Sequence, residues 1–390
     1  MITAPLGVLA VLAVNVSVSD WLGRRPGWHL LGAALLVIAL TAVCANVGLI
    51  PSVTDGSVAY EAVFSYVAPM AIFWLLLGVN LRSIVAAGLP MLSMFVLGAT
   101  GTLVGVLAAM TLIPPDVFGE YRAALAGMFV GTYIGGALNF NAVALEFGIQ
   151  REGLLYASAG VIDNLMTTVW MIATIALPRV LAPLWPRNAA ADAKVTPDDT
   201  TPATSAHDAG SDDETVGPGD LALMLALGAG ALLASQKLTD LIAGTGVELP
   251  QILVLTTVAL TLAQIPTIQR LRGARALGMF AVLLFLAAIG ALCDLGELAG
   301  TGSLGLGLSA LVTLAVLVHG MLVFAGAYVL RVDPAVAAVA SQANIGGGTS
   351  ALALARGLDR PELVAPALLI GSLGNAVGTY LGFFAADVLA

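Results

Sequence analysis

Charged residues are scarce in this sequence. Asp, Glu, Lys and Arg make up 10% of the 390 residues, whereas a soluble domain normally carries about 25%. Hydrophobic residues make up 59%, and they recur in continuous runs of about 20 residues, each long enough to cross the hydrocarbon core as a helix. The runs do not alternate with a period of two residues, as the strands of a membrane β-barrel would. The sequence therefore predicts an all-α polytopic membrane protein, which we expect in the cell inner (cytoplasmic) membrane.

Cysteine and histidine are also rare, with two and three residues respectively. Cys44 and Cys293 stand alone in apolar surroundings, so neither a disulfide framework nor a metal cluster is expected. No basic patch favours a nucleic-acid partner, and much of the net charge of -9 lies in one segment, 192–220. No catalytic triad or nucleotide-binding loop is recognisable. The sequence predicts neither an enzyme nor an organic cofactor.

Ten helical spans are expected, in two sets of five. The first set is 3–20, 28–49, 59–80, 86–113 and 153–178, and the second is 219–237, 249–266, 276–293, 302–330 and 362–388. Between the sets, residues 187–218 are rich in Ala, Thr, Asp, Ser and Pro. A stretch of this composition buries too little apolar surface to fold alone, which predicts a disordered linker. The linker divides the chain into a first repeat, 1–186, and a second repeat, 219–390.

Two further apolar segments, 123–148 and 334–358, are interrupted at their centres by glycines and polar residues. They are copies of one another: a shift of 211 residues places Gly135-Gly136 on Gly346-Gly347 and, further along, Asn164 on Asn375. Matches between Ala or Gly residues arise easily by chance in a sequence of this composition. Matched Asn and Thr residues within apolar spans do not. The sequence therefore predicts an internal repeat.

The distribution of basic residues indicates how the two interrupted segments lie in the membrane. If both crossed it completely, the 15 Lys and Arg residues would divide about evenly between the two sides. If both are re-entrant hairpins, twelve fall on one side and only Arg122, Arg151 and Lys237 on the other. Inner loops are enriched in Lys and Arg, which favours hairpins, with both termini outside and the linker in the cytoplasm.

Five spans separate the two hairpins, so the halves of the chain are expected to have inverted topology. Each hairpin arm has about 12 residues, or about 18 Å if helical. Both glycine tips would therefore reach the middle of the bilayer and face each other. Inverted repeats that meet there through broken helices are a recurring design of secondary transporters.

The hairpin tips are the candidate solute site. Glycine allows backbone to leave helical geometry and approach a ligand closely, and irregular backbone at membrane depth is tolerated only where it is buried or lines a cavity. Close packing of helices through small residues is the alternative explanation. The flanking amides and hydroxyls either satisfy the freed backbone or bind solute. The candidate substrate-binding residues are Thr132, Tyr133, Gly135, Gly136, Asn139 and Asn141 at the first tip, and Gln342, Asn344, Gly346, Gly347, Thr349 and Ser350 at the second.

Asp163 is the candidate ion-coupling carboxylate. It lies near the middle of the span 153–178, where an ionisable side chain is costly and marks a functional site by default. No Lys or Arg is near it in sequence, which suits a site for Na⁺ or a proton; a protonated structural Asp is the alternative. Asn164 and Asn375 would add amide oxygens at matching places in the two halves. We expect Asp163, Asn164 and Asn375 to serve coupling of Na⁺ or H⁺. His319, inside another span, is expected to pack or to bond between helices.

Three stretches resemble the YjcL-like family of uncharacterised bacterial membrane proteins. They are 131–144 (GTYIGGALNFNAVA), 162–164 (IDN) and 343–347 (ANIGG). That family resembles a wider group that includes sodium:glutamate symporters, 2-hydroxycarboxylate transporters, bile-acid symporters and cation/proton antiporters. The resemblance implies a sodium-coupled elevator mechanism and a homodimer joined through scaffold helices. The chain lacks the His that follows Gly-Gly in the glutamate symporters, and it has no arginine at a tip.

Together these features predict a secondary active transporter, a Na⁺-coupled symporter of a small organic solute such as an amino acid, short peptide or hydroxy acid. The transport core would contain the two hairpins with the spans 153–178 and 362–388, and the other spans would form the scaffold. A cation/proton antiporter is the first alternative. A membrane receptor or structural protein that no longer transports is the second.

Overall fold

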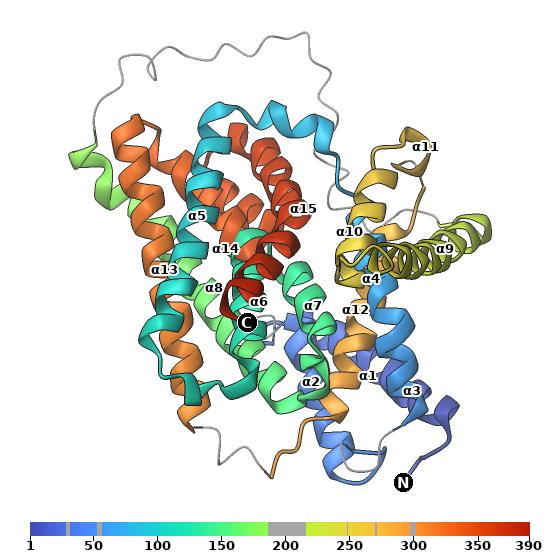
Figure 1. Cartoon of the computed structure of the whole chain (residues 1–390). Helices are drawn as coiled ribbons and strands as arrows, with labels where there is room; N and C mark the ends of the chain where they lie inside the picture. Colours follow the sequence, from blue (N-terminus) through green and yellow to red (C-terminus); the bar gives the residue numbers. More distant parts are fainter. Residues whose placement is uncertain (29–31, 53–56, 186–215, 248, 270, 297–301) are drawn as a thin grey trace.

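The computed structural model describes residues 1–28, 32–52, 57–185, 216–247, 249–269, 271–296 and 302–390. Every regular element in these ranges is a helix (Figure 1). Eight helical stretches are long and apolar enough to cross a membrane, and two shorter apolar helices, Gly32–Asn46 and Gln251–Leu262, accompany them. A helix therefore occupies each of the ten stretches in which a span was predicted, with ends that differ by a few residues.

In the first half of the chain the helices follow one another closely. They are α1 (Pro5–Gly23), α2 (Gly32–Asn46), α3 (Val58–Ala62), which continues through the π-helical η1 (Val63–Val67) into α4 (Ala68–Leu76), η2 (Leu81–Ala87), α5 (Leu89–Leu112), η3 (Pro115–Val117), η4 (Gly119–Tyr121), α6 (Arg122–Gly135), α7 (Ala137–Glu146), η5 (Ile149–Arg151), α8 (Gly153–Leu181) and η6 (Ala182–Leu184).

The second half contains fewer and longer elements. They are α9 (Pro218–Ala243), α10 (Gln251–Leu262), α11 (Pro266–Gln269), α12 (Ala274–Ala291), α13 (Gly302–Leu330), α14 (Pro334–Gly357), η8 (Pro361–Leu363) and α15 (Val364–Leu389). The predicted linker, 187–218, lies outside the described residues except for its last three, and Pro218 begins α9. The division into repeats 1–186 and 219–390 therefore stays a prediction.

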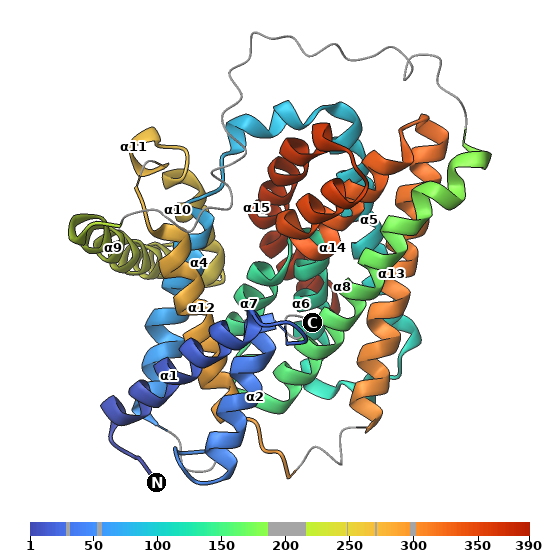
Figure 2. The same cartoon turned by 180° about the vertical axis from the view of Figure 1, so that it is seen from behind.

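The helices gather into two bundles that stand side by side in Figures 1 and 2. The first, here called the hairpin bundle, contains α5, α6, α7, α8, α13, α14 and α15. Within it α5 packs on α13 through glycine: a Cβ built on Gly101 would lie 2.8 Å from the Cα of His319, and one on Gly105 would lie 2.8 Å from the carbonyl oxygen of Ala315. Small residues let membrane helices approach this closely.

The spans 86–113 and 302–330, predicted as scaffold, form α5 and α13, which pack beside the hairpin segments. The division of the spans into transport core and scaffold stays a prediction. The glycine row on α5 that includes Gly101 and Gly105 is visible in the sequence, yet nothing in the sequence says which helix it faces.

The second bundle, here called the outer bundle, contains α1 to α4 and α9 to α12. Aromatic side chains join its members: the rings of Phe64 and Phe285 meet edge to face at 5.9 Å, and the indole N–H of Trp74 donates to the carbonyl oxygen of Met224 at 2.8 Å. Glycine again allows close contact, because Gly290 of α12 lies against the carbonyl group of Ile38 on α2.

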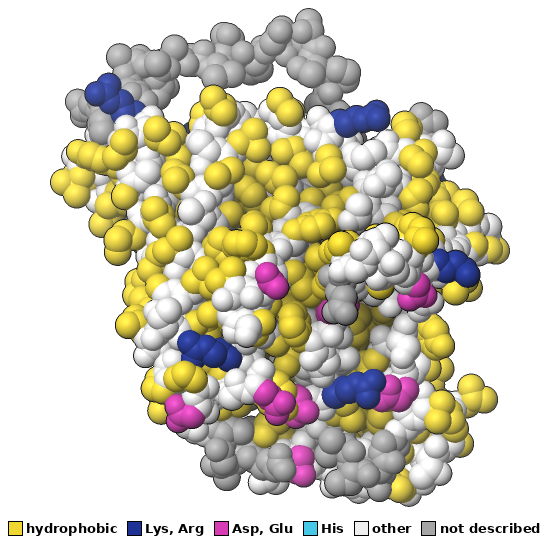
Figure 3. Space-filling model, viewed as in Figure 1, with side chains coloured by type: hydrophobic (Ala, Val, Ile, Leu, Met, Phe, Trp, Pro, Cys, Tyr) yellow, Lys and Arg dark blue, Asp and Glu magenta, His cyan; other side chains and the backbone are white. Residues whose placement is uncertain are grey.

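The surface is largely hydrophobic. Figure 3 shows hydrophobic side chains over most of the visible face, with few charged groups among them. On α8, Leu165 and Ile172 are each 64% exposed. Large apolar side chains exposed over several long helices are expected where the neighbouring medium is lipid.

Candidate functional site

Both interrupted segments are broken at a glycine. The helical path stops between α6 and α7 at Gly136, with φ 97° and ψ -176°, and inside α14 at Gly347, with φ 74° and ψ -179°. Side chains rarely tolerate such positive φ values, and glycine adopts them without a Cβ penalty. The breaks fall where the sequence predicted the tips of the two hairpins.

The first break reverses the chain. Gly127 packs on Val143, and Gly131 packs on Asn139. The two members of each pair are equally far from Gly135 in sequence, so α7 runs back along α6 and the two helices form a hairpin. Gly347 has nearly the same backbone angles as Gly136, which gives α14 a matching break.

The two breaks touch one another. A Cβ built on Gly136 would lie 3.5 Å from the Cα of Gly347. The Asn344 side chain reaches across and donates through Nδ2 to the carbonyl oxygen of Ile134 at 3.5 Å. The tips also rest on α15, where Gly135 abuts the carbonyl group of Gly374. The structure therefore brings together the two glycine motifs that are 211 positions apart in the sequence.

The first hairpin is held to neighbouring helices by its two asparagines. Asn139 accepts from the Thr379 hydroxyl at 2.8 Å and donates to the carbonyl oxygen of Gly374 at 3.3 Å. Asn141 accepts through Oδ1 from the Tyr156 hydroxyl. Both amides are buried. The oxygen and the nitrogen of the Asn139 amide are both hydrogen-bonded to α15. The structure therefore shows Asn139 fixing the first hairpin to α15.

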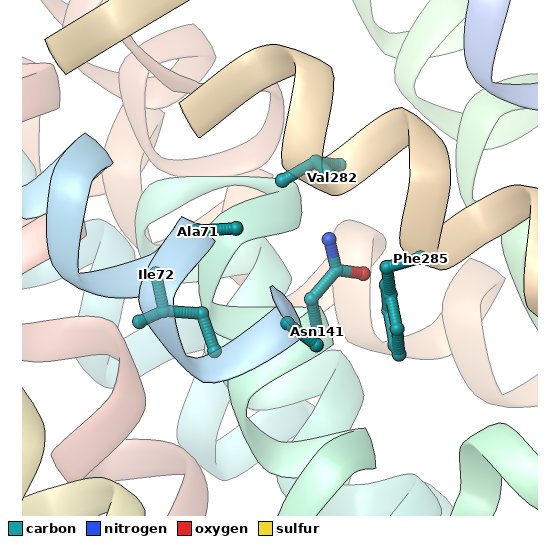
Figure 4. Close-up of a pocket in the computed structure, with 6 residues that line it drawn as sticks. Ala71, Ile72, Asn141, Val282 and Phe285 are labelled. Carbon is teal, nitrogen blue, oxygen red and sulfur yellow. The ribbon is translucent and has the colours of Figure 1, made fainter. Parts of the chain in front are cut away.

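The amide of Asn141 also borders a small cavity between the two bundles. The other lining residues are Ala68, Ala71 and Ile72 of the outer bundle's third span and Val282 and Phe285 of α12. Figure 4 shows the Asn141 amide pointing between Val282 and Phe285. The cavity thus combines one polar group from the hairpin with apolar groups from the outer bundle.

Asp163 lies on α8 beside the first hairpin. Its carboxylate is close to the hydroxyls of Tyr133 and Thr132, and Tyr156, about two turns away on the same helix, carries a hydroxyl near it. The Tyr133 hydroxyl interacts with the Asp163 carboxylate, but neither Asp163 Oδ1 nor Tyr133 Oη, both buried, makes a hydrogen bond of ordinary geometry among the described residues. Buried polar atoms usually have well-formed partners, so a bound cation or proton would complete this place.

The oxygen-rich character of this place is compatible with a hard monovalent cation. A carboxylate and two hydroxyls are oxygen ligands of the kind that hard cations prefer. Across the described ranges, no three His, Cys, Asp or Glu side chains come together as a metal cluster would require. The residues present therefore fit Na⁺ or a proton at Asp163, with Thr132 and Tyr133 as the neighbouring oxygen donors.

The two predicted asparagine ligands are placed differently. Asn164 is exposed, and its amide donates to the carbonyl oxygen of Gly160 in its own helix at 2.8 Å. Asn375 is half-buried on α15. The structure shows neither side chain next to Asp163, and their part in ion coupling stays a prediction.

The second tip leaves other atoms unpaired. Gln342 and Asn344 are fully buried, and Gln342 Nε2 and Asn344 Oδ1 have no hydrogen-bond partner within the described part of the chain. Gly346 and Ser350 are half-buried and Thr349 is exposed. At the first tip residues 131–136 are buried and Ala137 is exposed, so each tip has an exposed residue just after its break.

A chain of hydrogen bonds through His319 supports the first hairpin and α14. The Trp170 N–H donates to Ser341 Oγ at 2.9 Å, and the Ser341 hydroxyl lies 2.8 Å from His319 Nε2. His319 Nδ1 is 2.9 Å from the carbonyl oxygen of Gly98. A carbonyl only accepts, so Nδ1 carries the proton and Nε2 accepts from Ser341. His319 therefore has the interhelical role predicted for it.

Thr102 extends this chain to the first hairpin. It lies 3.0 Å from His319 Nδ1 and donates to the carbonyl oxygen of Tyr133 at 3.0 Å. Thr102, Ser341 and Trp170 were not predicted as supporting residues. The one sign of such supporting residues in the sequence was His319 itself, a lone histidine in an apolar span, because a buried imidazole needs hydrogen-bond partners on neighbouring helices.

The fold and its apolar helices define a multi-pass membrane protein, and comparison with known proteins supports this class. A family model described as "Protein of unknown function (DUF819)" matches residues 10–390. The chain is also 30% identical over 389 residues to a Bacillus subtilis (strain 168) protein named "Uncharacterized membrane protein YjcL", with 96% of this chain and 94% of that protein covered. The chain therefore belongs to the DUF819 family, which confirms the YjcL-like membership that its motifs indicated.

Proposed function

We propose that the protein is a secondary active transporter in which a cation bound at Asp163 drives the movement of a small organic solute. The buried carboxylate oxygen of Asp163 beside the Tyr133 hydroxyl, next to two helix breaks that touch, is the observation that carries this proposal. Broken helices that meet in the middle of the membrane are typical of secondary transporters. Nothing else in the described chain leaves an acidic oxygen buried and unpaired.

The proposed topology has two inverted halves. The hairpin of α6 and α7 enters from outside, and α14 forms a second hairpin that enters from the cytoplasm. Both termini lie outside and residues 187–218 in the cytoplasm, in the inner membrane. The excess of Lys and Arg on one side supports this orientation. We further propose that the protein is a homodimer.

The two bundles suggest how transport would proceed. The hairpin bundle holds the glycine tips and Asp163, while the outer bundle contacts it through few polar pairs. In one pair, the hydroxyl oxygens of Thr257 on α10 and Tyr380 on α15 are 2.7 Å apart. Glu146 accepts from the backbone N–H of Ile252 at 3.3 Å.

Arg151 and Glu61 form an ion pair across the same boundary at 2.8 Å, and Gly153 of α8 packs on the backbone of Leu292. An elevator mechanism, in which the hairpin bundle slides along the outer bundle, would require these polar pairs and this packing to exchange partners.

A cation/proton antiporter is the second candidate, because Asp163 has no basic partner in the described structure and could exchange a cation for a proton. Flux into proteoliposomes tests both. Amino acids, dipeptides and hydroxy acids are offered with an inward Na⁺ gradient or with an equal K⁺ gradient. Uptake that needs both a solute and Na⁺ supports symport. Proton movement driven by Na⁺ without solute supports antiport, and flux of neither kind contradicts the proposal.

A further inference from the structure

Tyr156 of α8 contacts both bundles through one side chain. It is buried, with 3% of its surface exposed, and its hydroxyl donates to Oδ1 of Asn141 in the first hairpin. Its ring packs edge to face on Phe140 of α7, with 5.3 Å between ring centroids, and on Phe285 of α12, with 6.2 Å. Tyr156 therefore joins the hairpin, α8 and the outer bundle at one point.

Tyr156 also belongs to a row of six buried aromatic rings that runs from the side of Asp163 into the outer bundle. In order, the rings are those of Tyr133, Phe129, Phe140, Tyr156, Phe285 and Phe64, and successive centroids are 5.3 to 6.2 Å apart. Rings at this spacing attract one another. The row crosses the boundary between the bundles where Tyr156 meets Phe285. It ends at Phe64 in the π-helical turn η1, and such turns frequently mark functional sites.

The Tyr156 hydroxyl lies between two acceptors. It is bonded to Asn141, and it interacts electrostatically with the Asp163 carboxylate, which lies two turns further along the same face of α8. Its single proton serves one acceptor at a time. A hydrogen bond to an ionised acceptor is about twice as strong as one to a neutral acceptor. An empty, ionised Asp163 therefore draws the hydroxyl away from Asn141, and a cation on Asp163 removes that attraction.

A small cavity beside this contact leaves room for the rings to shift. Asn141, Val282 and Phe285 are among the residues that line it (Figure 4). In a close-packed interior a ring moves only where a neighbouring space can receive it. Loss of the bond between Tyr156 and Asn141 can therefore change the contact with Phe285 at the boundary.

We propose that Tyr156 couples the cation site to the contact between the two bundles. A cation at Asp163 keeps the Tyr156 hydroxyl on Asn141 and the ring on Phe285, and loss of the cation loosens both. Tyr156 is then a positioning residue for the proposed transport, and this inference rests on that proposed function. The state of the cation site would be felt at the surface along which the bundles move.

The test compares Na⁺ binding with the response at the boundary. Val282→Cys is made in the full chain, because Val282 is half-buried and lines the cavity beside Asn141. Its rate of modification by N-ethylmaleimide is measured in NaCl and in KCl of equal concentration. Leu277→Cys is the matched control, since Leu277 is a half-buried residue of the same helix and does not line the cavity. The chain without an added cysteine gives the background from Cys44 and Cys293.

Modification at position 282 is expected to be slower in NaCl than in KCl by about fivefold or more, because a hydrogen bond to a charged group is the stronger one. The two salts should give equal rates at position 277. Tyr156→Phe keeps the ring and removes the hydroxyl, so it should abolish the salt difference at 282 while NaCl still raises its unfolding temperature. Asp163→Asn, which imitates the neutralised site, should be modified slowly at 282 in both salts.

Equal rates at 282 in the two salts would overturn the proposal, as would a salt difference that persists in Tyr156→Phe. The second result would mean that Tyr156 only packs. If Tyr156→Phe does not fold, Asp163→Asn decides, and rates at 282 that still depend on the salt would overturn the proposal. A protein that NaCl does not stabilise would contradict the proposed cation site itself, whereas stabilisation without a response at 282 would contradict the coupling alone.

Discussion

Gly136 and Gly347 lie against each other where the two broken helices meet, with the Cα of one 3.5 Å from the position of a Cβ on the other. They have the same positive-φ conformation and come from matching places in the two halves of the chain. The contact brings the two breaks into one small volume. A methyl group on Gly136 would only touch Gly347, whereas one on Gly135 would overlap the backbone of Gly374.

The first prediction concerns this crowding. In Gly135→Ala the new methyl group would overlap the carbonyl group of Gly374, which is backbone and cannot swing aside. We expect a loss of about 1–3 kcal/mol or more in the free energy of unfolding, as for other overpacked interiors. Gly160→Ala is the control, since no atom lies within 4 Å of the place that its new methyl group would take. Thermal unfolding in detergent should show a large fall for the first variant and little change for the second. Similar unfolding temperatures would contradict the close contact between the tip and α15.

The second prediction concerns topology. If α6 and α7 form a re-entrant hairpin, the residues on either side of it lie on the same face of the membrane. Single cysteines at Asp116 and Glu152 should both react with an impermeant thiol reagent from outside. Cysteines at Leu330, which ends α13, and at Gly357, which ends α14, should both react only from the cytoplasm. These four positions are exposed. Reaction of Asp116 and Glu152 from opposite sides would show that α6 and α7 cross the membrane and would remove the inverted repeat.

The third prediction concerns the hydrogen bonds around His319. Thr102→Val removes the hydroxyl that reaches the Tyr133 carbonyl and the imidazole, and it leaves both groups buried. A loss of about 1–3 kcal/mol is expected, the cost of an unpaired buried polar group. Thr100→Val is the matched control, because Thr100 is exposed on the same helix and bonds only to Val96 of its own turn. Equal unfolding temperatures for the two variants would contradict a supporting role for the His319 chain.

The sequence predicted the positions of the two breaks because a glycine pair flanked by polar residues is unusual inside an apolar run. It could not show that the Asn139 amide would be hydrogen-bonded to Thr379 and Gly374. These partners are more than 230 positions away, and they reach Asn139 only because of the way α15 packs. The partner helix of the α5 glycines could not be predicted for a similar reason. Glycines that permit close packing are visible in a sequence, but the choice of partner helix is made by the whole bundle.

The fourth prediction concerns motion between the bundles. Thr257 and Tyr380 face each other across the boundary, so a short reducible cross-linker between cysteines at these positions should stop solute uptake, and reduction should restore it. Cysteines at Leu97 and Gly326 provide the control, because these residues touch within the hairpin bundle and their cross-link should leave uptake unchanged. Undiminished uptake with the cross-bundle link in place would exclude the elevator mechanism.

The most direct test of the account is whether Na⁺ binds at Asp163. The purified protein should unfold at a higher temperature in NaCl than in KCl of equal concentration, because a ligand at 100 times its Kd stabilises the folded state by about 2.7 kcal/mol. Asp163→Asn keeps the side-chain size and removes a charge that is costly at this depth, so the variant should fold and lose the difference between the two salts. Asp116→Asn, a change at an exposed carboxylate, should retain it. A sodium-dependent shift that persists in Asp163→Asn, or no shift in the unaltered protein, would contradict the account.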